Sequence, residues 1–106
     1  MKRGDIYWVN LESTKGAENK KLCPCVIVSA TPINKARHTI VVIPLSTSTK
    51  ARPPLVVGVH CLNRVATAIC DQIRTVDKSQ LVKPVGQINL EDLETLEDGL
   101  RQVLSL

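Results

Sequence analysis

Aromatic residues are scarce in this chain, which has no phenylalanine, one tyrosine and one tryptophan among its 106 residues. Proteins that bind single-stranded nucleic acid without sequence preference usually stack successive bases on several aromatic rings. Tyr7 and Trp8 are the only side chains that could serve in this way, so an aromatic platform of the usual kind is nearly excluded. Packing in the core or against a second copy is the expected role for Trp8.

The sequence also lacks a long apolar run. No stretch approaches the roughly 20 apolar residues that a membrane-spanning helix needs, and Met1, Lys2 and Arg3 lead directly into a glycine and an aspartate. We therefore expect no signal peptide and a cytoplasmic protein. The four cysteines (Cys23, Cys25, Cys61 and Cys70) are then expected to be reduced, mostly buried thiols, because three of the four lie in or beside β-branched segments.

The spacing of the cysteines is unfavourable for a metal site. Cys23-Pro24-Cys25 has one intervening residue instead of the two of a zinc knuckle, and no second cysteine pair or H-x-x-x-H motif follows. The other potential ligands are scattered along the chain (His38, His60, Cys61 and Cys70). We expect no metal and no other cofactor, and we place the two histidines in a loop and at a strand end.

Length and composition predict one folded domain over residues 1–106. The chain has the usual size of a domain, and its 43% apolar content is sufficient for a core. The net charge of +4 is unevenly distributed along the chain. Residues 1–53 contain nine lysines and arginines and three acidic residues, whereas residues 54–106 contain five lysines and arginines and seven acidic residues. The first part thus carries +6 and the second −2. A basic first part suits a polyanion, although lysines also serve simply as a solvated face.

Hydrophobic patterns predict the secondary structure. The polar residues 13–22, with Gly16, predict a long loop that could carry function. From Leu90 to Leu104, apolar residues recur three and four apart, and Asn89 precedes them as a helix N-cap. Short β-branched segments predict five strands, at residues 5–11, 25–30, 39–45, 55–59 and 65–70. The expected fold is mainly β with a C-terminal helix (α+β), a curled antiparallel sheet packed against that helix.

Three segments carry a family resemblance. The first covers residues 3–11 (RGDIYWVNL) and continues through residues 14–16 (TKG) and Glu18 to residues 24–28 (PCVIV). The second is residues 42–48 (VIPLSTS), and the third is residues 70–78 (CDQIRTVDK). In their order and spacing, over nearly the whole chain, these segments resemble the MazF/PemK/Kid family of toxin endoribonucleases.

This resemblance implies an SH3-like barrel of the CcdB/MazF/Kid type, with about five to seven antiparallel strands. It also implies a homodimer, a cytoplasmic toxin, metal-independent cleavage of single-stranded RNA at short sequence motifs, and inhibition by a cognate acidic antitoxin. Two other functions stay open. One is a member that binds RNA or antitoxin without cutting, and the other is a gyrase poison like CcdB, against which the three segments argue.

Three positions depart from the residue types that the family uses in catalysis. Cys23 stands where members commonly have an arginine just before a proline, and a thiol lacks the permanently charged, bidentate fork of a guanidinium. Ala17 and Ile69 stand where some members have a histidine in the first loop and an arginine beside the DQ motif. These three roles are not carried over to this chain, so a catalytically impaired member is the alternative.

The resemblance places the catalytic groups of this chain at Ser46, Asp71 and Glu18. Metal-free RNA cleavage uses the substrate's own 2′-hydroxyl as nucleophile, so it needs a base, an acid and donors to the phosphate. Ser46 keeps a hydroxyl where the family usually has a threonine, or else it caps a turn at the strand end. Asp71 is a base, or else it bonds to loop backbone. Arg74 is expected to hold Asp71 or Asp77 in place.

Seven further residues are predicted to contact the substrate. The amide of Gln72 can read a base edge. One of Lys20 and Lys21 could supply the charge that is missing at Cys23, as a point charge instead of a fork. The alternative role of the basic residues in this set is solubility. The predicted substrate-binding residues are Lys20, Lys21, Thr47, Ser48, Lys50, Arg52 and Gln72.

Overall fold

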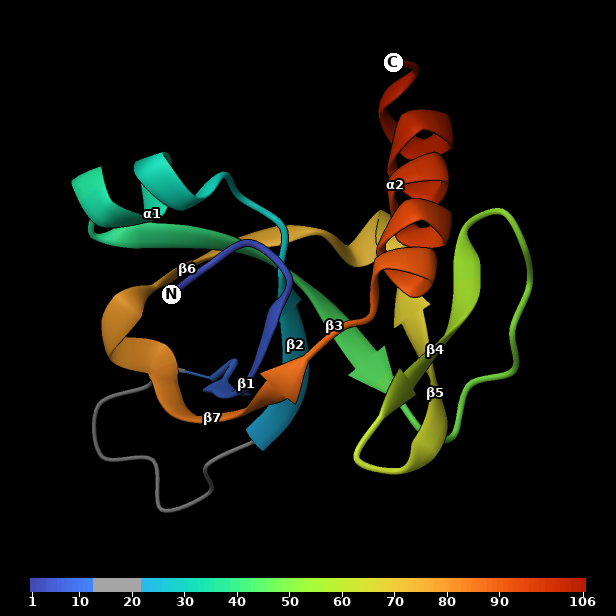
Figure 1. Ribbon diagram of the computed structural model, residues 1–106, viewed down its shortest axis with the longest axis horizontal. Helices are drawn as coiled ribbons and strands as arrows, with labels where there is room; N and C mark the ends of the chain where they lie inside the picture. The colour runs from blue at the N-terminus through green and yellow to red at the C-terminus, as the bar shows by residue number, and fades with distance from the viewer. Residues whose placement is uncertain (13–21) are drawn as a thin grey trace.

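The computed structural model describes residues 1–12 and 22–106 (Figure 1). In these ranges the strands are β1 (Asp5–Asn10), β2 (Leu22–Ile27), β3 (Thr39–Ser46), β4 (Val56–Cys61), β5 (Arg64–Ile69), β6 (Arg74–Asp77) and β7 (Leu81–Gln87). The helices are α1 (Thr31–Ala36) and α2 (Leu90–Leu104), and two 3-10 turns, η1 (Cys70–Gln72) and η2 (Lys78–Gln80), flank β6. None of the described helices has the length and apolar character needed to cross a membrane.

The strands form one curled antiparallel sheet. Its order is β4-β5-β3-β2-β1-β7, and β6 is a further partner of β3. The start of β3, Thr39 to Val42, pairs with β6, whereas Leu45 and Ser46 at its end pair with β5. Pro44, which has no N–H for a ladder bond, lies where the partner changes. The prediction of a mainly β fold, a curled antiparallel sheet of five to seven strands with a C-terminal helix, is confirmed.

The sequence prediction placed five strands correctly but missed three elements. The strands β6 and β7 and the helix α1 were not predicted, and β2 begins at Leu22, inside the expected loop, and ends at Ile27. The rest of that loop, residues 13–21, lies outside the described residues. Two strands were therefore added to the predicted set, both after the DQ motif.

Two apolar cores lie on opposite faces of the central strands, as alternation along a strand requires. On β2, Val26 contributes to the core under α2, whereas Cys25 and Ile27 contribute to the core toward β6. On β3, Ile43 and Leu45 belong to the first core and Ile40 and Val42 to the second. A sheet covered on both faces explains why its strands read as continuous apolar runs.

Helix α2 closes the first core and is held by polar contacts at its start. Its predicted N-cap is confirmed, since Asn89 Oδ1 accepts the backbone N–H of Asp92 at 2.7 Å. The buried Asp92 accepts from the backbone N–H of His60 at 2.8 Å, and its carboxylate lies 2.9 Å from His60 Nδ1. Leu96 is fully buried against the sheet. Figure 1 shows the helix standing beside β4 and β5. The His60–Asp92 contact therefore ties β4 to α2.

The cysteines, all of which lie in the described part of the chain, form no disulfide. Cys25, Cys61 and Cys70 are buried and Cys23 is half-buried, as expected. Burial raises the pKa of Cys61, and burial together with the charge of Asp71 raises the pKa of Cys70 to about 11. These buried thiols are therefore neutral at physiological pH. Among the described residues, no cluster of three metal-binding side chains occurs.

Candidate active site

Cys23 and Ser46 lie at the same corner of the sheet. Cys25 pairs with Pro44 across β2 and β3. Continuing this antiparallel register by two residues places Cys23 opposite Ser46, with both side chains on one face. In agreement, Cys23 Sγ lies 3.4 Å from the carbonyl oxygen of Leu45. The Cys23 thiol, at the position where the family resemblance implies an arginine, therefore lies against the backbone of the residue before Ser46.

The Ser46 hydroxyl is part of the turn that follows β3. Its oxygen accepts the backbone N–H groups of Ser48 and Thr49, both at 3.2 Å, and lies 3.3 and 3.0 Å from their side-chain oxygens. The turn-capping role is therefore present in the structure. It is compatible with catalysis, because two backbone donors fix the oxygen in place and leave its proton for a hydroxyl or a phosphate oxygen.

Thr67 of β5 supports this turn from below, and the sequence analysis missed it. Its side chain is 6% exposed, and its Oγ1 lies 3.1 Å from the carbonyl oxygens of both Ser46 and Thr49. The sequence feature that could have identified Thr67 is its hydroxyl, which stands among the apolar residues 65–70. The turn that carries the exposed Thr47 and Ser48 is consequently anchored at both ends.

Asp71 and Gln72 are exposed in η1. No hydrogen bond joins either side chain to another described residue, so the alternative in which Asp71 bonds loop backbone is not seen there. Lys50 and Arg52, which follow the Ser46 turn, are also exposed. Ile69, at the end of β5, is half-buried next to η1. These exposed groups are free to meet a ligand.

The prediction for Arg74 was wrong. Within the described residues it forms no ion pair with Asp71 or Asp77. Instead its Nη2 donates to the carbonyl oxygen of Leu11 at 3.4 Å. Asp77 accepts the backbone N–H of Ser79 at 2.9 Å, and that bond lowers the pKa of Asp77. The carboxylate expected to hold Arg74 therefore closes its own turn.

The structure places Arg74 beside the thiols. Arg74 pairs with Val42 of β3, whose other neighbour, β2, carries Cys25 two residues from Cys23. A hydrogen bond with Cys23 and burial raise the pKa of Cys25, whereas the charge of Arg74 lowers it. Arg74 thus brings a guanidinium to the face that carries Cys23 and Ser46. Glu18, Lys20, Lys21 and Ala17 lie outside the described residues.

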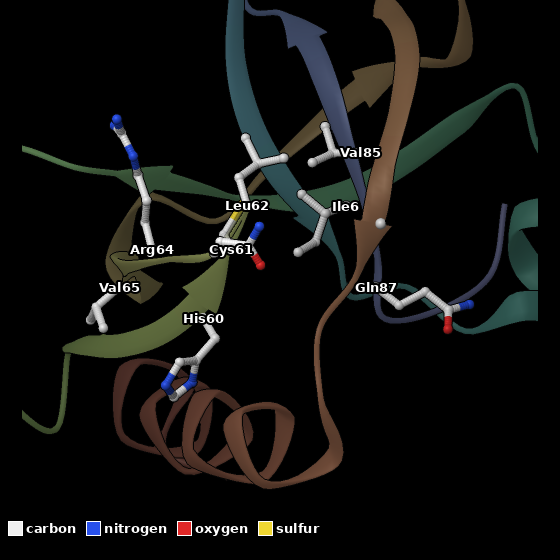
Figure 2. A pocket seen from close by; sticks show the side chains of 10 residues that line it. Ile6, His60, Cys61, Leu62, Arg64, Val65, Val85 and Gln87 are labelled. Atoms are coloured by element: carbon white, nitrogen blue, oxygen red, sulfur yellow. The ribbon is translucent and has the colours of Figure 1, made fainter.

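Two cavities flank the turn between β4 and β5. The larger, about 630 Å³, opens between this hairpin and strands β1 and β7 and is lined by His60, Val85 and Gln87 among others. Figure 2 shows the His60 ring lying over α2, whereas the Arg64 side chain extends away from that helix. The smaller, about 450 Å³, reaches the corner itself. Its lining residues are Trp8, Leu22, Pro24, Leu45, Thr47, Cys61, Leu62, Arg64 and Ala66.

The fold is that of known small toxins. An endoribonuclease from a mycobacterial species, solved in complex with its cognate antitoxin, matches the whole chain with a TM-score of 0.84 and 22% identity, over 96% of its own length. MazF from Deinococcus radiodurans also matches the whole chain, with a TM-score of 0.83 and 18% identity, over 97% of its length. At these identities, the structural likeness establishes the fold alone.

The sequence establishes the family. The family of PemK-like, MazF-like toxins of type II toxin–antitoxin systems matches residues 2–104, and the chain belongs to it. Endoribonuclease MazF9 of Mycobacterium tuberculosis is 28% identical over 115 residues, covering the whole chain and 98% of that protein. Endoribonuclease EndoA of Bacillus subtilis is 25% identical over 111 residues, covering the whole chain and 96% of that protein.

Proposed function

We propose that this chain is the toxin of a type II toxin–antitoxin module and acts in the cytoplasm as a metal-independent endoribonuclease on single-stranded RNA. The family membership and the relatives called endoribonucleases support the proposal. The observation that carries it is the turn after β3, in which two backbone N–H groups fix the Ser46 hydroxyl oxygen and leave its proton available to a phosphate. Arg74 of the neighbouring strand β6 pairs with Val42, on the same strand β3 as Ser46.

The proposed mechanism uses the 2′-hydroxyl of the RNA as nucleophile. Asp71 or Glu18 removes its proton, and the 2′-oxygen bonds to phosphorus to form a 2′,3′-cyclic phosphate. The bond from phosphorus to the 5′-oxygen breaks, and the 5′-oxygen leaves as a hydroxyl with a proton from the protonated carboxyl group or from water. Ser46 donates to a phosphate oxygen on which charge accumulates during this step. A cation near the same phosphate, from Arg74, Lys20 or Lys21, stabilises that charge. Thr47, Ser48, Lys50, Arg52 and Gln72 contact the flanking nucleotides.

A second candidate function is binding of RNA or antitoxin without cleavage. A cysteine at position 23 favours it, because the permanently charged fork of an arginine is missing there. The two candidates differ in one assay. A long RNA incubated with the purified protein in chelator, with the new ends mapped, should give cuts at a short recurring motif if the chain is an enzyme. Intact RNA that is bound would support the second candidate and contradict the first.

Replacing Ser46 by alanine should lower the single-turnover cleavage rate about tenfold, the value of one neutral hydrogen bond made in the transition state. Since Ser46 also caps its turn, urea unfolding of the variant is measured alongside the rate. Thr49→Ala is the matched control, because it removes a hydroxyl from the same turn and leaves the Ser46 oxygen with its two backbone donors. Equal rates in parent and Ser46→Ala would remove Ser46 from the mechanism.

We further propose that the toxin is a two-fold dimer whose antitoxin lays an acidic, partly disordered segment over the basic loops. The excess of lysine and arginine through Pro53 supplies the attraction. Affinity for the antitoxin should therefore fall as the ionic strength rises past about 0.1 M, where the Debye length is about 10 Å. Titrations at several salt concentrations measure this. A salt-independent affinity would contradict the acidic segment.

A further inference from the structure

The cavity beside Ser46, hereafter the Trp8 cavity, contains the only tryptophan of the chain. Its volume, about 450 Å³, is in the range of small-molecule sites. Pro24 and Leu45 line it, and each is the chain neighbour of a residue of the corner, Cys23 or Ser46. Because successive side chains of a strand point to opposite faces, the cavity and the corner lie back to back at the same strand ends. Thr47, which follows Ser46, also lines the cavity.

Leu62 forms part of the wall in an unfavourable backbone conformation. It is 53% exposed and has a positive φ of 54°, in the two-residue turn that it forms with Asn63. Such turns favour Asn, Asp or Gly at both central positions, and Asn63 fits this rule whereas Leu62 does not. A strained, exposed and apolar residue beside a cavity points to a role in contacting a ligand, since the fold itself would be better served by asparagine.

Arg64 supplies positive charge to the same cavity. Its side chain is exposed, and within the described residues it forms no ion pair. Thr47 adds a hydroxyl, and none of the described residues that line the cavity carries a carboxylate. An apolar slot between an indole and a leucine, with a guanidinium and a hydroxyl at its edge, has the chemistry that holds an unstacked nucleobase.

We propose that the Trp8 cavity binds one nucleobase of the RNA, next to the phosphate held at the corner, and that it prefers guanine. This inference rests on the proposed function for the identity of the ligand. The base lies between Trp8 and Leu62. Arg64 donates to the base edge, and guanine offers an arginine two adjacent acceptors, O6 and N7. On the corresponding edge adenine offers one acceptor beside an amino donor, cytosine an amino donor, and uracil a single carbonyl oxygen.

The single tryptophan gives a direct test. Four 2′-O-methyl trinucleotides of the form UXU, with X as A, C, G or U, have no 2′-hydroxyl nucleophile and stay uncut. Stacking of the central base on Trp8 should quench its fluorescence in a saturable way. The dissociation constant for X = G should be about tenfold lower than for the other three, as one good arginine–guanine contact gives.

Variants separate the parts of the site. Arg64→Gln should remove the preference for guanine while quenching by all four trinucleotides persists. Arg101→Gln is the matched control, because Arg101 pairs with Asp98 on α2 and its loss changes the net charge equally. Leu62→Asn should weaken the binding of all four trinucleotides to the same extent. It should leave the thermal stability of the protein equal or higher, since asparagine suits the positive φ.

Three results would overturn the inference. The first is cleavage of RNA by the protein with no change in Trp8 fluorescence for any trinucleotide. The second is a guanine preference that survives Arg64→Gln. The third is a change of oligomeric state in Leu62→Asn, which would assign the cavity to a second copy of the chain. Guanine-dependent quenching in a protein that cuts no RNA would instead support the base site and contradict the proposed cleavage.

Discussion

Replacing Cys23 by arginine is expected to raise the single-turnover rate of RNA cleavage about 100-fold, the usual worth of one electrostatic donor aimed at developing charge. The thiol lies 3.4 Å from the carbonyl oxygen of Leu45, the residue before Ser46, so a guanidinium that starts here reaches the phosphate to which Ser46 donates. Because that charge develops only as the bond breaks, the gain should appear in the rate and hardly in substrate affinity. Rapid mixing of excess enzyme with a short labelled RNA measures both.

Cys23→Met is the matched control, since it lengthens the side chain without adding charge. If Cys23→Arg folds, dimerises and cuts no faster than the parent, the positive charge already comes from elsewhere or the phosphate binds at another place. Arg74→Gln, and a double change of Lys20 and Lys21 to alanine, then distinguish these explanations in the parent protein. A collapse of activity in one of them identifies the residue that supplies the charge. Full activity in both would move the phosphate away from this corner.

The elements that were predicted correctly are those whose local signals agree with their tertiary setting. The runs of β1 to β5 are rich in β-branched residues, and both faces of the central strands are buried, so packing and propensity favour the same state. Helix α2 combines a stripe of leucines with a capping asparagine, and both features can be recognised from the sequence alone. In these elements the hydrophobic pattern alone was sufficient.

The missed elements are stabilised by contacts that are distant in sequence. The helix α1 has six residues, and its buried Asn34 bonds to the Ser29 side chain and to the carbonyl oxygen of Met1. Strand β7 contains Pro84 and Gly86, two residue types that weaken the sequence signal for a strand. The sheet tolerates them because β7 lies at its edge and pairs irregularly with β1. Neither pattern could be read locally.

The candidate site was predictable only in part, for the same reason. Sequence proximity suggested Asp71 and Asp77 as partners of Arg74, but the pairing of β6 with β3 carries that guanidinium to Leu11, 63 residues away in the chain. The Trp8 cavity likewise joins β1 to the β4–β5 turn. The expectation for Ser46 comes from a motif within one segment, whereas partners across strands can be predicted only when the pairing register is known.

The position of η1 depends on a close contact with α2 at Gly99. A Cβ at this residue would lie 2.6 Å from the carbonyl oxygen of Pro54 and 2.7 Å from Cys70 Sγ, both closer than real Cβ contacts. Cys70 is the first residue of η1, and its Sγ donates to the carbonyl oxygen of Leu96 at 3.8 Å. The packing of α2 thus positions the turn that presents Asp71 and Gln72.

Gly99→Ala should therefore destabilise the protein by about 2 kcal/mol, although alanine is normally favoured over glycine inside a helix by about 1 kcal/mol. The reason is that the new Cβ would meet the backbone carbonyl of Pro54, so that α2 or that backbone must shift, which costs more than moving the end of a flexible side chain. Thermal unfolding should show a fall in Tm of roughly 10 °C for a domain of this size.

The control for this change is Gly86→Ala, whose new Cβ would meet no atom within 4 Å and should leave Tm nearly unchanged. The cleavage rate is also measured well below Tm, where both variants are folded. A slower rate in Gly99→Ala alone would tie catalysis to the position of η1, as expected if Asp71 is the base. If Gly99→Ala instead raised Tm, helix propensity would outweigh the contact, and the close packing of α2 on Cys70 would have no part in holding Asp71 in place.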